Sequence, residues 1–118
     1  GKYSSIAEYF RKIPYNEIKI PIIVKAELLF GIEKSERKEN NRKAFENFIK
    51  PFEVINLNND SLDYYAKIRA GLEKSGNIIG SNDLFIASIV LAHNGILITH
   101  NTNEFNRIEK LKIEDWVR

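Results

Sequence analysis

The 118-residue chain contains no cysteine, which excludes both a disulfide framework and a metal site built on thiolates. It contains no methionine either, so the initiator residue is missing, and we expect Gly1 to lie inside a longer natural sequence. No apolar run approaches the roughly 18 residues that a membrane span requires, and no signal-peptide pattern opens the chain. These absences predict a cytoplasmic protein with no part in a membrane.

A large excess of charge of either sign is also lacking. Eighteen lysines and arginines stand against 16 acids, and the net charge of +2 permits a local nucleic-acid-binding patch without arguing for one. With 43% hydrophobic and 29% charged residues, the composition is that of a globular protein. The length predicts a single domain over residues 1–118.

The common catalytic signatures are missing as well. The sequence has no GxGxxG, GxxxxGKS, HExxH or GxSxG motif, which argues against the usual dinucleotide, P-loop, zincin and hydrolase sites. No pairing of histidine with cysteine offers a zinc site. Candidate chemistry therefore rests on acidic side chains.

The stretch from Ile78 to Phe105 carries the clearest structural pattern. A Gly-Ser-Asn-Asp turn opens an almost unbroken apolar helix, Leu84–Ala92, which Asn94 and Gly95 end. The strand that follows, Ile96–Thr99, lacks polar alternation and is predicted to be buried on both faces. Helix, stop and buried strand in this order form the second half of a βαβ unit, which predicts an α/β fold with a mostly parallel sheet.

Apolar spacing and helix-ending residues predict further elements on both sides of this stretch. In chain order they are a helix capped by Ser5 and ended by Pro14, a strand at Glu17–Ile20, a helix from about Pro21 to about Ser35, a charged segment at Lys34–Lys43, a helical stripe from Ala44 to Ile49 ended by Pro51, a strand at Phe52–Leu57, a helix capped by Asp60 and stopped near Gly76, a return of Ile108 and Leu111 onto the sheet, and a terminal strand at Ile113–Val117. The first helix has no strand before it, which is unusual in an alternating α/β chain.

Three acids fall where parallel sheets build their sites. Glu27 lies at the edge of an apolar helical stripe, Asp83 in the first turn of the central helix, and Glu104 just beyond the strand that follows. A hard divalent ion such as Mg²⁺ takes a few carboxylates and water as ligands. The alternative is that each acid is structural, because 16 acids offer many triplets and Asp83 also favours a helix N-terminus electrostatically.

Four short blocks, in order, resemble a known family: AELLFGIEKS (Ala26–Ser35), IGSNDLFIAS (Ile79–Ser88), LITHNTNEF (Leu97–Phe105) and EDW (Glu114–Trp116). Together they resemble PIN-domain ribonucleases and, more narrowly, the VapC toxins of type II toxin–antitoxin systems. The resemblance covers nearly the whole chain. It implies a Rossmann-like α/β/α sandwich and endoribonuclease activity that depends on Mg²⁺ or Mn²⁺.

By this resemblance, Glu27, Asp83 and Glu104 match metal-binding acids, and Thr99 and Asn101 match polar positions that shape the site. The implied reaction is attack of metal-activated water on an RNA phosphodiester, with no protein nucleophile. The implied partners are structured RNA such as tRNA, a cognate VapB-type antitoxin and a second copy of the chain.

If RNA binds, we expect phosphate contacts from the basic residues of the charged segment: Lys34, Arg37, Lys38, Arg42 and Lys43. The alternative is that this run is a solvated face, which is the usual role of such a sequence.

One feature of the family is missing. Its chains open with a strand that carries an Asp-Thr-Asn motif, whose Asp is normally a metal ligand, and residues 1–20 contain no such motif. We therefore expect that this first strand is absent, that the sheet is rearranged around the gap or has it filled, and that the chain is a poor enzyme. Two other functions stay open: a catalytically inactive PIN-like module that binds a protein or RNA, and an unrelated α/β binding domain with a receiver-like fold.

Overall fold

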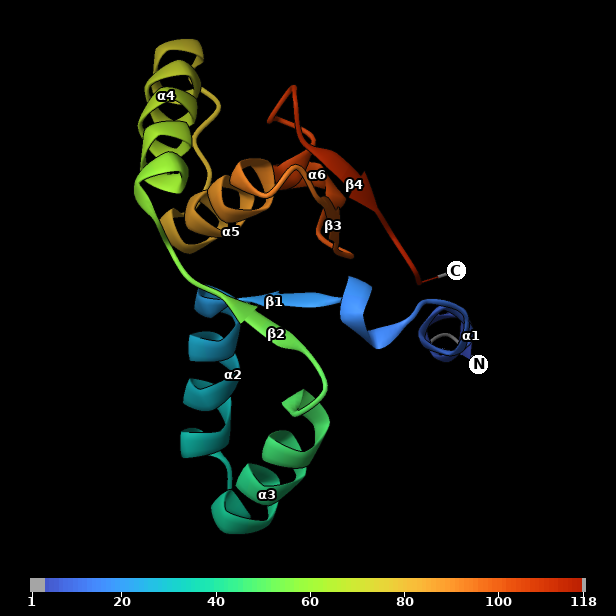
Figure 1. Cartoon of the computed structure of the whole chain (residues 1–118). Coiled ribbons are helices and arrows are strands. Elements are labelled where there is room, and N and C mark those ends of the chain that lie inside the picture. The colour runs from blue at the N-terminus through green and yellow to red at the C-terminus, as the bar shows by residue number, and fades with distance from the viewer. Residues whose placement is uncertain (1–3, 118) are drawn as a thin grey trace.

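The computed structural model describes residues 4–117 and shows helices alternating with short strands (Figure 1). The helices are α1 (Ser4–Lys12), α2 (Ile22–Lys34), α3 (Lys38–Ile49), α4 (Asn59–Ser75), α5 (Ser81–Ala92) and α6 (Thr102–Phe105), with a 3₁₀ turn η1 at Tyr15–Glu17. The strands are β1 (Lys19–Pro21), β2 (Glu53–Ile55), β3 (Ile96–Ile98) and β4 (Lys112–Glu114). This order confirms the predicted α/β class.

The four strands form two parallel pairs, which are not hydrogen-bonded to each other. In one sheet β1 pairs with β2, with Ile20 opposite Val54; in the other β3 pairs with β4, with Leu97 opposite Ile113. Helices connect the two strands of each pair, as parallel pairing requires. The parallel topology is confirmed, with the strands divided between two sheets.

Helix α5 is the centre of the core. Ala87, Ser88 and Ile89 have no exposed surface, and the burial of α5 on several sides confirms its predicted place. The apolar side chains that surround it come from α4, the loop between α4 and α5, β3, and the segment around α6: Leu72, Ile79, Leu97, Phe105, Ile108 and Leu111. The one buried polar group on this helix, the Ser88 hydroxyl, donates a hydrogen bond to the carbonyl of Leu84 at 2.6 Å, so its burial leaves no unsatisfied donor.

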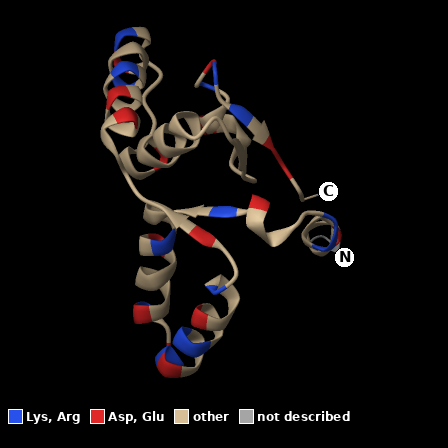
Figure 2. Cartoon of the chain, viewed as in Figure 1, with Lys and Arg blue, Asp and Glu red and all other residues tan. Residues whose placement is uncertain are grey.

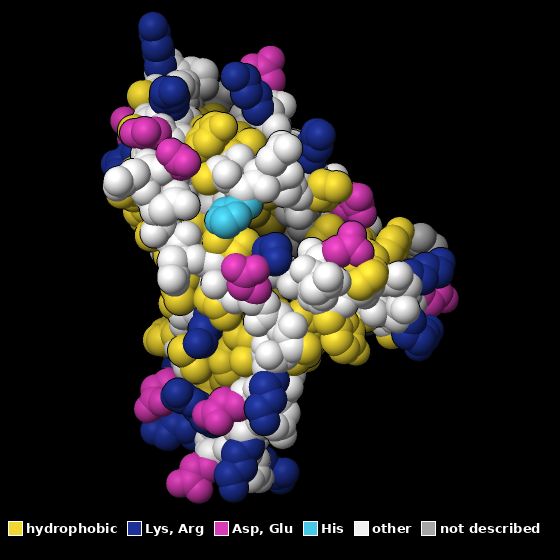
Figure 3. All heavy atoms as spheres, viewed as in Figure 1, with side chains coloured by type: hydrophobic (Ala, Val, Ile, Leu, Met, Phe, Trp, Pro, Cys, Tyr) yellow, Lys and Arg dark blue, Asp and Glu magenta, His cyan; other side chains and the backbone are white. Residues whose placement is uncertain are grey.

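Helices α2 and α3 form an arm that extends away from α4 and α5 (Figure 1). The arm is anchored where α2 begins, because Ile23 and Val24 pack against the core cluster. No residue of α2 is itself buried, and Phe30 is 65% exposed. In the view of Figure 3, hydrophobic side chains gather at the base of the arm and charged ones at its tip.

The strand β3 differs from its prediction. Only Leu97 is buried, while Ile96 and Ile98 remain 52% and 40% exposed. Alternate side chains of a strand point to opposite faces, so Ile96 and Ile98 share the face opposite Leu97. The described residues cover one face of this strand only, and the prediction of burial on both faces is therefore wrong.

Two predicted helix caps are also wrong. Ser5 lies inside α1, and its hydroxyl donates a hydrogen bond to the carbonyl of Trp116 instead of capping the helix. Helix α4 is capped by Asn58 rather than Asp60: the Ser61 N–H donates to Asn58 Oδ1 at 2.9 Å, and the Asn58 N–H donates to Ser61 Oγ at 2.7 Å. This reciprocal pair satisfies two backbone N–H donors at once, and the structure therefore uses Asn58 rather than Asp60 as the cap. Gly76, with a φ of 78°, ends α4 as predicted.

The C-terminal segment is fastened to α1 by aromatic contacts. The ring of Trp116 stacks on that of Tyr9 with centroids 4.7 Å apart, and it meets Phe10 edge to face at 5.6 Å. Trp116 is only 6% exposed as a result. Among residues 4–117, no helix is both long and apolar enough to cross a membrane.

Candidate active site

Three helices carry the acids that the sequence singled out. Glu27 projects from the middle of α2, Asp83 from the first turn of α5, and Glu104 from α6, which follows β3. Glu27 is exposed, whereas Asp83 and Glu104 are partly buried. Segments far apart in the chain thus contribute one acid each.

The electrostatics of Asp83 show which of these acids the fold brings together. Burial raises the pKa of Asp83, and a hydrogen bond with the Glu104 carboxyl, the charge of Glu104 and the charge of Glu27 raise it further, to about 6. The side chains of Asp83 and Glu104 therefore lie close enough to interact, and the charge of Glu27 also acts on Asp83. All four effects disfavour the ionised form, which makes this a region of concentrated negative charge.

Glu27 is held by a residue that the sequence did not single out. Asn82 Nδ2 donates a hydrogen bond to Glu27 Oε1 at 3.1 Å, across 55 positions of the chain. The bond ties α2 to the N-terminal turn of α5 and fixes one oxygen of Glu27 beside the turn that carries Asp83. One signal for this role was available in the sequence: Asn82 directly precedes Asp83. Consecutive helix residues point about 100° apart, so Asn82 can reach a neighbour of the site that Asp83 does not.

The type of these ligands suits a hard divalent cation, which prefers carboxylate oxygens. Within residues 4–117, however, no three His, Asp or Glu side chains form a group already spaced to hold a metal ion. The raised pKa of Asp83 bears directly on the fit, because a cation between these acids would offset the repulsion that raises it. The residues therefore match such an ion in ligand type and charge, but not in spacing.

Thr99 and Asn101 shape the turn that leads into α6. The backbone N–H of Asn101 donates to Thr99 Oγ1 at 3.0 Å, and the N–H of Thr99 donates to the carbonyl of Glu114, also at 3.0 Å. Beside them, His100 Nδ1 lies 2.9 Å from Asp115 Oδ2 on the surface, a pairing that the sequence did not signal. These contacts hold the end of β3 against the segment that continues from β4, so the start of α6 has a fixed position.

Two of the five basic residues expected at RNA phosphates are engaged with acids. Lys38 Nζ lies 2.7 Å from Glu33 Oε1, and Arg42 Nε lies 3.2 Å from Glu46 Oε1. Figure 2 shows the basic and acidic residues interleaved over α3. These pairs are exposed and individually weak, but each acid competes with a phosphate for its cation.

The other three basic residues have no such acidic partner. Within the described part of the chain, Arg37 and Lys43 form no ion pair, and Lys34 Nζ lies 5.0 Å from the centre of the Phe30 ring. Lys34 is thus held beside an exposed aromatic side chain rather than beside a carboxylate.

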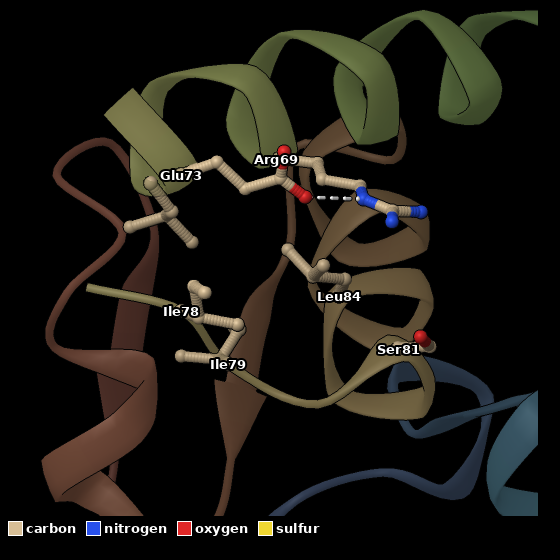
Figure 4. A pocket seen from close by; sticks show the side chains of 7 residues that line it. Arg69, Glu73, Ile78, Ile79, Ser81 and Leu84 are labelled. Carbon is tan, nitrogen blue, oxygen red and sulfur yellow. Dashed lines mark hydrogen bonds and ion pairs between the residues drawn. The ribbon is translucent and has the colours of Figure 1, made fainter. Parts of the chain in front are cut away.

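The pockets of the described residues lie away from the three acids. A small pocket of about 80 Å³ opens between α4 and α5, with an ion pair between Arg69 and Glu73 (2.9 Å) beside it (Figure 4). Ser81 and Leu84 line it from α5, whereas Asp83 points to another side of that helix because residues turn by about 100° each. A larger groove between α4 and the segment after α6 contains none of the three acids. Neither of these two pockets therefore includes the acid region.

Comparisons with known proteins place this arrangement in a family. The family model described as PIN domain matches residues 3–111. Ribonuclease VapC2 of Rickettsia felis is 44% identical over 101 residues, which cover 86% of this chain and 75% of the relative. The tRNA(fMet)-specific endonuclease VapC of Shigella flexneri is 31% identical over 116 residues, which cover 98% and 87%. The crystal structure of DNA-bound VapBC from Salmonella typhimurium matches with a TM-score of 0.90 and 33% identity, over 96% of this chain and 85% of that one.

The chain belongs to the PIN domain family, whose model matches most of its length. The parallel strand pairs, and the acids that three helices contribute, agree with this assignment. The relatives that resemble it over three quarters or more of their length are VapC proteins. The resemblance carried by the four sequence blocks is confirmed, and the receiver-like alternative is wrong.

Proposed function

We propose that the protein is a metal-dependent endoribonuclease toxin of a VapBC-type toxin–antitoxin system. The observation that carries the proposal is the grouping of Asp83 with Glu104 and Glu27, whose charges act on it, in a chain whose relatives are named ribonucleases and endonucleases. Hydrolysis of a phosphodiester by bound water needs concentrated carboxylates and no nucleophilic side chain, and the acid region has this composition.

In this proposal Asp83, Glu104 and Glu27 hold Mg²⁺ or Mn²⁺. When bound, the ion supplies an activated water molecule and stabilises the charge that develops on the phosphate. Asn82 orients Glu27 through its amide, and Thr99 sets the turn that delivers Glu104. With a pKa of about 6, Asp83 is largely ionised at neutral pH and ready to bind a cation.

The substrate and partners follow from the relatives. The Shigella flexneri protein is named as specific for tRNA(fMet), which supports a structured RNA such as tRNA as the substrate here. The solved VapBC complexes support a cognate VapB-type antitoxin as a partner. The proposal also includes a homodimer. It includes a cytoplasmic location too, because the RNA substrate and the antitoxin are found in the cytoplasm.

A second function is favoured by one observation, the lack of a group within residues 4–117 already spaced to hold a metal ion. It is a catalytically inactive PIN-like module that binds a protein partner or RNA. This alternative predicts binding without cleavage, whatever divalent ion is added.

The test measures cleavage of a structured RNA by the full chain with Mg²⁺ or Mn²⁺, and again with EDTA. We expect cleavage only with the metal, and none from the Asp83→Asn variant, because the amide keeps the size of the side chain but removes the charge that holds the cation. The Asp60→Asn variant is the matched control, since Asp60 also lies in the first turn of a helix and stands outside the acid region. Cleavage that persists in EDTA or in Asp83→Asn would rule out the mechanism, and binding without cleavage would favour the inactive module.

A further inference from the structure

One face of α2 carries a stripe of residues that runs from the acid region out along the arm. Ile23, Glu27, Phe30 and Lys34 recur three or four positions apart, so they share this face. The fold uses the first half of the stripe: Ile23 packs against the core cluster, and Glu27 accepts the hydrogen bond from Asn82. The second half projects beyond these contacts.

Phe30 is an aromatic side chain that the fold leaves outside its core. Its ring is 65% exposed, and its neighbours along the stripe are the carboxylate of Glu27 on one side and the ammonium of Lys34 on the other. Leu28, which is 44% exposed, lies about 160° away around the helix, given about 100° per residue. Phe30 therefore does not share its side of α2 with Leu28, and it lies beside the Lys34 cation instead.

Gly31 lies on the same stripe, one turn after Glu27, and the fold gives no packing reason for a glycine there. A Cβ built at this position would meet no atom within 4 Å. A glycine inside a helix costs about 1 kcal/mol relative to alanine, so the absence of a side chain is not favourable in itself. It leaves open space against the backbone between Glu27 and Lys34, where a molecule from outside the chain can approach closely.

We propose that Phe30, Gly31 and Lys34 form a nucleotide-binding strip that aligns a single-stranded segment of RNA with the acids. An unpaired base stacks on Phe30, the space over Gly31 admits its sugar, and Lys34 contacts the adjoining phosphate. Exposed aromatic rings next to cations are the groups that bind unpaired bases, whose faces are free, whereas the bases of a duplex stay stacked on one another. Glu27 lies one helical turn, about 5.4 Å along the axis, from this strip, so the neighbouring phosphodiester falls at the acid region.

This inference rests on the proposed function and assigns Phe30, Gly31 and Lys34 to the positioning of an unpaired nucleotide of its RNA substrate. The test measures the affinity of the full chain for a short fluorescein-labelled single-stranded oligoribonucleotide by fluorescence anisotropy, with EDTA present to prevent cleavage. Phe30→Ala should weaken binding at least about fivefold, because the loss of one stacked base costs about 1 kcal/mol or more. Phe30→Tyr should restore binding, and Leu28→Ala, an exposed change on the other side of the helix, should leave it unchanged.

The salt dependence separates the role of Lys34 from that of Phe30. Lys34→Ala should reduce the slope of log affinity against log salt by about 0.7, the value for one phosphate contact on a single strand, while Phe30→Ala leaves the slope unchanged. With a fully paired duplex as the probe, Phe30→Ala should have no effect.

Equal affinity of Phe30→Ala and the unchanged protein would overturn the inference, as would an equal loss in Leu28→Ala. Loss of binding to a VapB-type antitoxin with full retention of RNA binding would overturn it too, and would assign Phe30 to a protein partner. If Phe30→Ala binds and cleaves RNA as well as the unchanged protein does, the nucleotide-binding strip is ruled out and the proposed function stands. If the unchanged protein neither binds nor cleaves RNA, both the proposed function and the strip are ruled out.

Discussion

Asn82 Nδ2 lies 3.1 Å from Glu27 Oε1, and this hydrogen bond joins the first turn of α5 to the middle of α2. Glu27 is otherwise exposed, and a free glutamate at the surface samples several rotamers. The amide of Asn82 removes part of that freedom, so the orientation of Glu27 depends on a residue that carries no charge itself.

Replacing Asn82 by alanine should weaken the binding of Mn²⁺ about 10- to 100-fold, the usual cost of removing a partner that orients a metal ligand. The measurement is isothermal titration calorimetry on the full chain. Asn103→Ala is the matched control, because Asn103 is exposed and adjacent to Glu104, and among residues 4–117 its side chain has no hydrogen bond to the three acids. Equal affinities in the two variants would show that Asn82 does not position Glu27.

The pKa of Asp83 predicts how stability depends on pH. It is about 6 in the folded chain, against an ordinary value of 3.8, so between about pH 4 and pH 6 the folded state holds a proton that the unfolded chain has lost. The free energy of unfolding that is due to this group is therefore highest at acid pH and falls as pH rises through the window. Asp83→Asn, which cannot ionise, should be more stable than the unchanged protein by roughly 1 kcal/mol at pH 8 and equal to it near pH 4.

Thermal or urea unfolding at several pH values tests this expectation, with Asp60→Asn as the control that should show no such pH-dependent gain. Added Mn²⁺ should reduce the difference between the unchanged protein and Asp83→Asn at pH 8, because the cation stabilises the ionised acids. A stability difference that stays constant from pH 4 to pH 8 would contradict the assignment of the raised pKa to Asp83.

The basic residues of the arm should contribute unequally to RNA binding. Arg37→Ala with Lys43→Ala should lower the slope of log affinity against log salt by about 0.7 for each lost contact, because neither cation has an acidic partner within the described residues. Lys38→Ala with Arg42→Ala should lower the slope less, since Glu33 and Glu46 already offset those charges. Filter binding over a range of salt concentrations provides the slopes, and identical slopes in both double variants would assign the run to solubility.

Trp116 should be important for stability although it lies two residues from the end of the chain. Its ring stacks on Tyr9 and is 6% exposed, so Trp116→Ala should lower the free energy of unfolding by about 3–5 kcal/mol, as truncation of a buried aromatic residue usually does. Trp116→Phe, which keeps part of the ring contact, should cost much less. A loss below about 1 kcal/mol in the alanine variant, measured by urea unfolding, would show that the C-terminal segment is only loosely attached.

The sequence predicted best where a pattern depends on a single local cause. The apolar run of α5 predicted a helix buried on several sides, because few other environments accept such a surface. Gly76 predicted the end of α4, since its φ of 78° is costly for other residues. Their predicted places at the ends of sheet strands made Glu27, Asp83 and Glu104 candidates, and the family resemblance then separated them from the other acids among the 16 in the chain.

Predictions failed where the outcome depends on contacts distant in sequence. Ser5 and Asp60 are good caps in isolation, but the carbonyl of Trp116 and the reciprocal pair of Asn58 with Ser61 provided better partners. The exposure of β3 could not be read from its apolar residues, because it depends on what covers the other face of the strand. The hydrogen bond of Asn82 to Glu27 joins residues 55 positions apart, a separation that no periodic pattern in the sequence reveals.

Six residues of α5 are buried, whereas α2 has none, and this contrast sets how fast the two helices open. Backbone amides of α5 should exchange with deuterium only when the whole domain unfolds, while those of α2 should exchange through local opening of the arm. Glu27 and Asp83 thus lie on helices that we expect to open at different rates, α2 more readily than α5. A cation or RNA that holds both acids must slow deuterium uptake in α2 and leave that in α5 almost unchanged.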